Sequence, residues 1–134
     1  MLEKMNADSN AINWFDIPVT DLPRAKEFYE TIFDIRMETG GPPEEQMAFF
    51  PRKKDTIMGL SGILSGALVK RKDFLPGKDG PLIYLNASPE LEPVLQRVKK
   101  AGGTILMDKT KIPAGYVATC LDSEGNRIGL HAPQ

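Results

Sequence analysis

Two amphipathic segments of matching pattern constrain the fold of this chain more than any other feature. Apolar residues recur at helical spacing in 21–33 and again in 90–101, so each segment predicts a helix with one apolar face that must cover a sheet. An offset of about 69 residues superimposes the two patterns and indicates an internal duplication. The superposition pairs Leu22 with Leu91, Ala25 with Val94, and Tyr29 with Val98.

Residues at the ends of both segments support the same prediction. Asp21 is a good N-cap because its carboxylate can accept from a free backbone N–H, and Pro23 falls in the first turn, where a missing N–H costs little. Pro93 is tolerated in the second helix for the same reason, and Gly102 with Gly103 supplies a left-handed end.

Strand-like stretches follow the same order around both helices, and turn-forming residues separate the two halves. The pattern predicts an α+β fold, with one domain over 1–134 made of βαβββ modules at 11–70 and 81–132. Since one helix covers only one face of a small sheet, the modules should pack on each other or on a second chain. The predicted strands are 11–19, 35–38, 47–51 and 65–69 in the first half, and 82–87, 104–108, 116–121 and 127–131 in the second.

Charge and composition exclude several classes of partner. A formal net charge of -1 offers no excess of Lys and Arg for nucleic acid or an anionic membrane. No apolar run approaches membrane-spanning length, and the first ten residues lack the apolar core of a secretory signal. The single cysteine, Cys120, permits no intramolecular disulfide, which is typical of a reducing compartment. We therefore expect a cytoplasmic protein.

Segments near the two ends of the chain carry a family resemblance. Residues 12–29 and 120–131 resemble the first strand and helix and the last hairpin of the glyoxalase/bleomycin-resistance/dioxygenase superfamily, also called vicinal oxygen chelate proteins. The resemblance spans 11–132 and is not specific over 40–64. It implies two βαβββ modules in a half-open barrel, a homodimer in many members, and a small organic ligand on the concave side.

The positions that hold a metal ion in many members of that family carry unsuitable side chains here. The resemblance assigns Trp14, Leu82 and Gly129 to three of these positions and leaves the fourth within 65–69, which contains no His, Asp or Glu. An indole, an alkyl group and a bare Cα cannot donate a lone pair to a divalent ion. We therefore predict neither a metal ion nor another cofactor.

A mixed set of aromatic and polar residues is predicted to face the concave side. Trp14 offers a flat apolar surface with one N–H donor, and strand alternation puts Asp16 on the same face. Such a mixture suits a planar or amphipathic small molecule, although the same side chains are equally suited to plugging the barrel. The candidate ligand-binding residues are Trp14, Asp16, Tyr84, Asn86, Gly129 and His131.

Several other polar residues have a structural interpretation that we favour. His131, the sole histidine, could act as a general acid or base, but it lies near the end of the last predicted strand. Cys120 stands in an apolar run typical of a core thiol rather than a nucleophile. Asp122 and Glu124 belong to a Gly-Asn turn, which favours turn geometry over a catalytic carboxylate pair.

Three functional hypotheses follow. The first is a metal-independent, glyoxalase-like protein that binds a small organic molecule. The second is a metal-dependent lyase, isomerase or dioxygenase of the same superfamily that uses nonstandard ligands such as Asp16 and His131. The third is a protein whose exposed sheet edges recruit another protein. The sequence does not decide whether a reaction is catalysed, and the identity of the ligand stays open.

Overall fold

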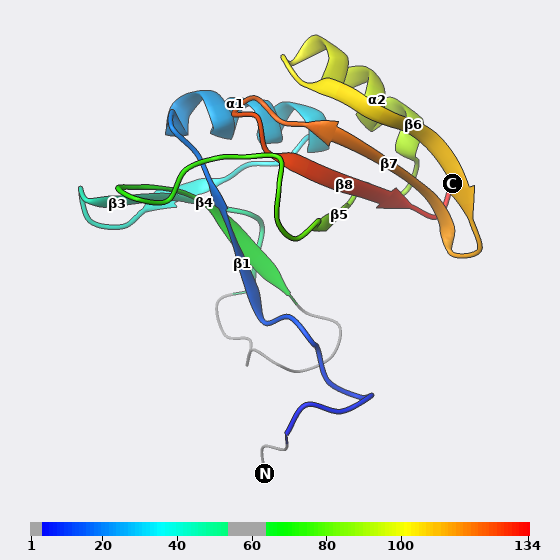
Figure 1. Cartoon of the computed structure of the whole chain (residues 1–134), viewed down its shortest axis with the longest axis horizontal. Coiled ribbons are helices and arrows are strands. Elements are labelled where there is room, and N and C mark those ends of the chain that lie inside the picture. Colours follow the sequence, from blue (N-terminus) through cyan, green and yellow to red (C-terminus); the bar gives the residue numbers. More distant parts are fainter. Residues whose placement is uncertain (1–3, 54–63) are drawn as a thin grey trace.

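The computed structural model describes residues 4–53 and 64–134 and contains two sheets of four strands, each with one helix (Figure 1). This architecture confirms the predicted α+β fold of two βαβββ modules. The first module contains β1 (Trp14–Pro18), α1 (Leu22–Phe33), β2 (Glu38–Gly40), β3 (Glu45–Phe49) and β4 (Ser65–Arg71). The second contains β5 (Tyr84–Asn86), α2 (Leu91–Lys100), β6 (Thr104–Ile112), β7 (Gly115–Leu121) and β8 (Arg127–Ala132).

The two sheets have the same topology, as the predicted duplication requires. Their strand orders are β1-β4-β3-β2 and β5-β8-β7-β6, and the first pair in each sheet is parallel while the others are antiparallel. In the parallel pairs, Trp14 lies opposite Ser65 and Tyr84 lies opposite Gly129. Asn86 lies opposite His131 as Pro18 lies opposite Val69, so Tyr84 holds in β5 the place that Asp16 holds in β1.

The ends of the helices follow the local sequence. Asp21 caps α1, since its side chain accepts from the backbone N–H of Arg24 at 3.0 Å, and Asp34 ends that helix with a left-handed φ of 52°. Glu90 occupies the N-cap position of α2, but its side chain makes no capping hydrogen bond. Gly102 follows the end of α2 with a φ of 99°, a conformation that glycine adopts without steric cost.

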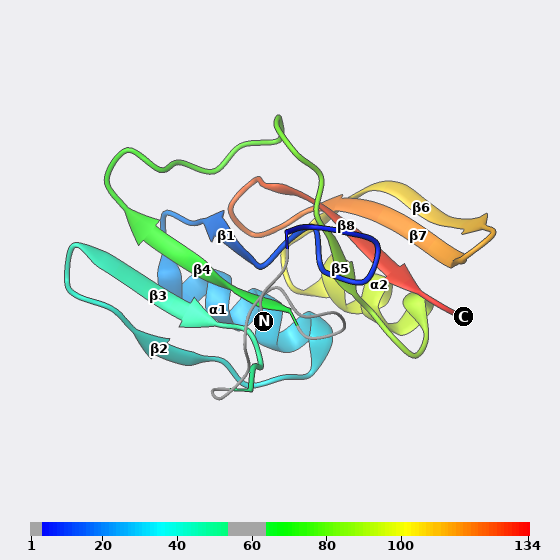
Figure 2. The ribbon, with the colours of Figure 1, turned by 90° about the horizontal axis from the view of Figure 1, so that it is seen from below.

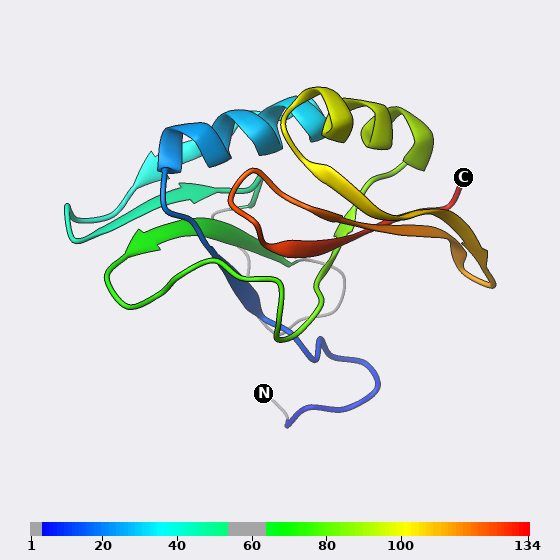
Figure 3. The same ribbon diagram turned by 45° about the horizontal axis from the view of Figure 1, so that its top comes forward.

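Both helices cover the same side of the two sheets and pack beside each other, as Figures 1 and 3 show. Apolar side chains from alternate strand positions meet the helices there and form one continuous core across both modules. The opposite, helix-free faces of the sheets are called the open faces below, and Figure 2 views the molecule from that side. Because this core is continuous and α1 contacts α2, the two modules pair within one chain. Fully buried core side chains include Phe28, Tyr29, Leu68, Leu95 and Leu130.

Several predicted strand boundaries were wrong. The strand expected at 35–38 begins only at Glu38, because the backbone N–H of Met37 donates to the Glu30 side chain at 2.8 Å instead of pairing with a strand. Strands β1 and β5 are shorter than predicted because each pairs with its neighbour over only a few residues. Strand β6 is longer and extends to Ile112. No helix within the described ranges is long and apolar enough to span a membrane.

Candidate functional site

The open face of the first sheet presents Trp14 and Asp16 side by side. Phe15 and Ile17 pack toward the core, so the alternating side chains of Trp14 and Asp16 point to the other side of β1. The indole Nε1–H of Trp14 donates to Asp16 Oδ1 at 2.9 Å, and Arg71 Nη1 lies 3.8 Å from Asp16 Oδ2. The indole is therefore held in one orientation by its own polar atom, which leaves its apolar surface for packing or for a ligand.

An aromatic and cationic cluster surrounds the indole. The rings of Trp14 and Phe49 meet edge to face, with 6.2 Å between their centroids. The guanidinium carbon of Arg52 lies 4.1 Å from the Phe49 centroid and 6.0 Å from the Trp14 centroid. Sequence analysis missed Phe49 and Arg52, because their position beside Trp14 depends on how β3 pairs with β4 and not on a local pattern.

The open face of the second sheet carries the other four predicted residues. Tyr84 is 50% exposed, and its ring lies over Gly129, where an added Cβ would come within 2.5 Å of the ring. Asn86 is exposed and accepts from the backbone N–H of Ser88 at 3.0 Å. His131 Nε2 lies 2.8 Å from the carbonyl oxygen of Ala114, so a backbone carbonyl orients the imidazole.

Neither of two cavities formed by the described residues brings the six predicted residues together. A groove of about 660 Å³ opens between the modules and includes Tyr84 and Asn86 among its lining residues. A smaller hollow of about 320 Å³ includes Asp16. The remainder of the groove is lined mainly by apolar side chains of the core and by residues of α2, including Phe15, Phe33, Phe50, Pro93, Val94 and Arg97.

Sequence and structure comparisons agree on one family for a chain with these features. The family model described as the Glyoxalase/Bleomycin resistance protein/Dioxygenase superfamily matches residues 11–130. The chain belongs to this superfamily. A search of curated proteins found no match for this superfamily member.

Solved structures of the same fold are distant in sequence. A glyoxylase/bleomycin resistance protein/dioxygenase domain from Frankia sp. EAN1pec has a TM-score of 0.66 at 16% identity, covering 93% of this chain and 98% of that chain. A glyoxalase-related enzyme from Fulvimarina pelagi has a TM-score of 0.64 at 15% identity, covering 89% and 85%. TnmS3, an antibiotic binding protein from Streptomyces sp. CB03234, has a TM-score of 0.60 at 21% identity, covering 93% and 97%.

The open faces of this glyoxalase-superfamily protein do not fit a divalent ion. By the register of the two parallel pairs, Tyr84 is equivalent to Asp16, so Leu82, two residues earlier, is the residue equivalent to Trp14. Trp14, Leu82 and Gly129 offer no lone-pair donor to a divalent ion, and Ser65, opposite Trp14, offers only a hydroxyl group. Among the described residues, no three His, Cys, Asp or Glu side chains lie close enough to share a metal ion.

Two residues of the metal-dependent alternative already have protein partners. Asp16 accepts from Trp14 and lies near Arg71, while His131 contacts the Ala114 carbonyl. Cys120 is fully buried, and burial is the main cause that raises the pKa of its thiol to about 12, with a smaller contribution from the charge of Asp122. A thiol with such a pKa is protonated at neutral pH and is a poor nucleophile.

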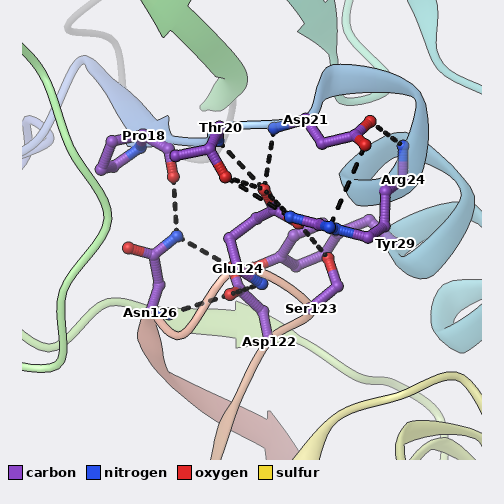
Figure 4. A network of polar contacts seen from close by, with 9 residues as sticks. All are labelled: Pro18, Thr20, Asp21, Arg24, Tyr29, Asp122, Ser123, Glu124 and Asn126. Carbon is purple, nitrogen blue, oxygen red and sulfur yellow. Dashed lines mark hydrogen bonds and ion pairs between the residues drawn. The ribbon is translucent and has the colours of Figure 1, made fainter.

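Asp122 and Asn126 form a buried polar network between the modules (Figure 4). Asp122 accepts from the Tyr29 hydroxyl at 2.6 Å, from the backbone N–H groups of Glu124 and Asn126, and from the Asn126 amide. The same amide donates to the Pro18 carbonyl at 2.8 Å. The turn predicted from these residues therefore also links the last hairpin to the first helix through hydrogen bonds.

Glu124 makes a second set of hydrogen bonds that links the last hairpin to the first helix. Its side chain is shielded from solvent and accepts from Thr20 and from the backbone N–H of Asp21, and Arg24 Nε lies 2.8 Å from its Oε2. Burial raises the pKa of Glu124 and is the largest single influence, but the hydrogen bonds from Arg24, Asp21 and Thr20 together lower that pKa to about 2. The carboxylate is a structural anion of the fold.

We expect this carboxylate to make stability pH-dependent. Because folding lowers the pKa of Glu124 from 4.5 to about 2, its contribution is complete above the unfolded value and is lost as the pH falls through the folded value. Glu124→Gln should therefore lower the free energy of unfolding by about 2 kcal/mol at pH 7 and flatten the loss of stability between about pH 5 and pH 2. Urea titrations over this pH range measure both effects.

The exposed carboxylate of Glu44 provides the control. Glu44→Gln should leave the pH profile of the free energy of unfolding unchanged. If the free energy of unfolding depended on pH in the same way in wild type and Glu124→Gln, the structural role of Glu124 would be contradicted.

Proposed function

We propose that this glyoxalase-superfamily protein binds a small planar or amphipathic organic molecule on its open faces without a metal ion. The observation that carries the proposal is the half-buried indole of Trp14, which is oriented by Asp16 and flanked by Phe49 on a helix-free face. A flat ligand could stack against this surface and lose little conformational entropy on binding.

Two further observations support binding over a purely structural plug. Tyr84, on the open face of the second module, leaves half of its surface exposed. An aromatic side chain that only filled a barrel would be enclosed by its neighbours. The antibiotic binding protein TnmS3, at 21% identity, shares the fold and adds support from analogy.

A fluorescence screen tests the proposal directly, because Trp14 is the only tryptophan. Planar polycyclic and amphipathic compounds without absorbance at the excitation wavelength should change its emission saturably and raise the melting temperature. A set of such compounds that leaves both quantities unchanged would contradict the proposal. A homodimer remains part of the proposal, and sedimentation velocity would measure it.

A further inference from the structure

We propose that the open face of the first sheet selects planar aromatic molecules that carry a carboxylate. The inference rests on the proposed function, because it names the ligand class of the same surface. Its basis is the guanidinium of Arg52, which lies beside the Trp14 and Phe49 rings. A ligand stacked on those rings would bring its substituents within reach of this cation.

Backbone contacts position Arg52 near the rings. The residue follows β3 by a short segment, and the Ser65 hydroxyl shares its one hydrogen between the carbonyl oxygens of Pro51, at 3.0 Å, and Phe50, at 3.3 Å. These bonds attach the segment to the start of β4, next to the strand that carries Trp14. The backbone just before Arg52 is therefore held beside β4, and the guanidinium itself lies beside the two rings.

The charge of Arg52 has no carboxylate partner within the described part of the chain. Ion pairs there include those of Arg24, Lys26 and Arg71, whereas the guanidinium of Arg52 lies beside the two rings. A cation–π contact uses the charge of a guanidinium but none of its five N–H donors. An exposed guanidinium is suited to two parallel hydrogen bonds with a carboxylate.

The acidic residues on this face do not cancel the preference of Arg52 for a ligand carboxylate. Asp16 and Glu45 lie 3.8 Å and 3.9 Å from the same Arg71 side chain, and Asp16 also accepts the indole N–H. Their charges are thus directed to Arg71, while Arg52 contacts the rings themselves. An aromatic carboxylate would match both the apolar surface of the rings and the positive charge of Arg52.

The test uses three probes that share one ring system: 2-naphthoate, the neutral 2-naphthamide and the cationic 2-naphthylmethylammonium. The single indole N–H signal of Trp14 in a ¹H–¹⁵N correlation spectrum reports binding at this face and gives each dissociation constant. We expect 2-naphthoate to bind roughly tenfold more tightly than 2-naphthamide at low salt, with the cation weakest. Arg52→Gln should remove the difference, while Lys53→Gln, which neutralises the adjacent exposed cation, should preserve it.

The outcomes separate the two proposals. Equal binding of all three probes, unchanged by Arg52→Gln, would overturn the carboxylate preference and leave the proposed function standing. Tighter binding of the cation would overturn the preference in the same way. No shift of the Trp14 signal with any probe would count against both proposals.

Discussion

Asp122→Ala should destabilise the protein by about 3–5 kcal/mol, because it removes a buried carboxylate that accepts four hydrogen bonds. The side chain is 4% exposed, and its partner Tyr29 is fully buried. Without the carboxylate, the Tyr29 hydroxyl and two backbone N–H groups lose their acceptor in a region that water does not reach freely. Chemical unfolding monitored by circular dichroism gives the free energy of unfolding.

A double-mutant cycle distinguishes this mechanism from a general loss of packing. Tyr29→Phe removes the hydroxyl and leaves Asp122 with its other three donors, so it should cost only about 1–2 kcal/mol. The double variant should be less destabilised than the sum of the single changes, since no orphaned hydroxyl remains. Asp79→Ala, at an exposed carboxylate, is the surface control. A cost below about 1 kcal/mol for Asp122→Ala would contradict the structural role of the network.

Trp14→Ala should weaken binding of a planar aromatic ligand by about 30- to 100-fold, equivalent to about 2–3 kcal/mol. The change removes the largest ring of the open face, and with it the surface on which we propose that the ligand stacks. Calorimetric titration measures the effect, because the variant contains no tryptophan for fluorescence.

Two controls separate loss of the binding surface from loss of the fold. Trp14→Phe retains a ring at the same position and should cost less than about tenfold in affinity. Phe33→Leu changes the groove between the modules and should leave binding unchanged. Full affinity in Trp14→Ala, or an equal loss in Phe33→Leu, would contradict binding on the open face.

Local patterns in the sequence were sufficient to predict the fold. Helical spacing identified α1 and α2, and the capping side chain of Asp21 behaves as predicted. Strand alternation correctly put Trp14 and Asp16 on one face, where they share a hydrogen bond. These features depend on residues a few positions apart, which is the range over which propensity and periodicity carry information.

Features that depend on distant residues could not be predicted in the same way. The Tyr29–Asp122 bond joins residues 93 positions apart, so the turn motif alone gave no sign of it. The bounds of the strand predicted at 82–87 were wrong because β5 pairs with the distant β8 over only three residues. The cluster of Trp14, Phe49 and Arg52 likewise requires the pairing of three strands.

The most direct test of binding on the open face is a crystal structure with the tightest ligand from the fluorescence screen. We predict that the aromatic ring of the ligand lies against Trp14 and Phe49, on the helix-free side of β1, β3 and β4. A ligand seated instead in the groove beside Phe33 and Val94, with the Trp14 indole free of contact, would contradict the account.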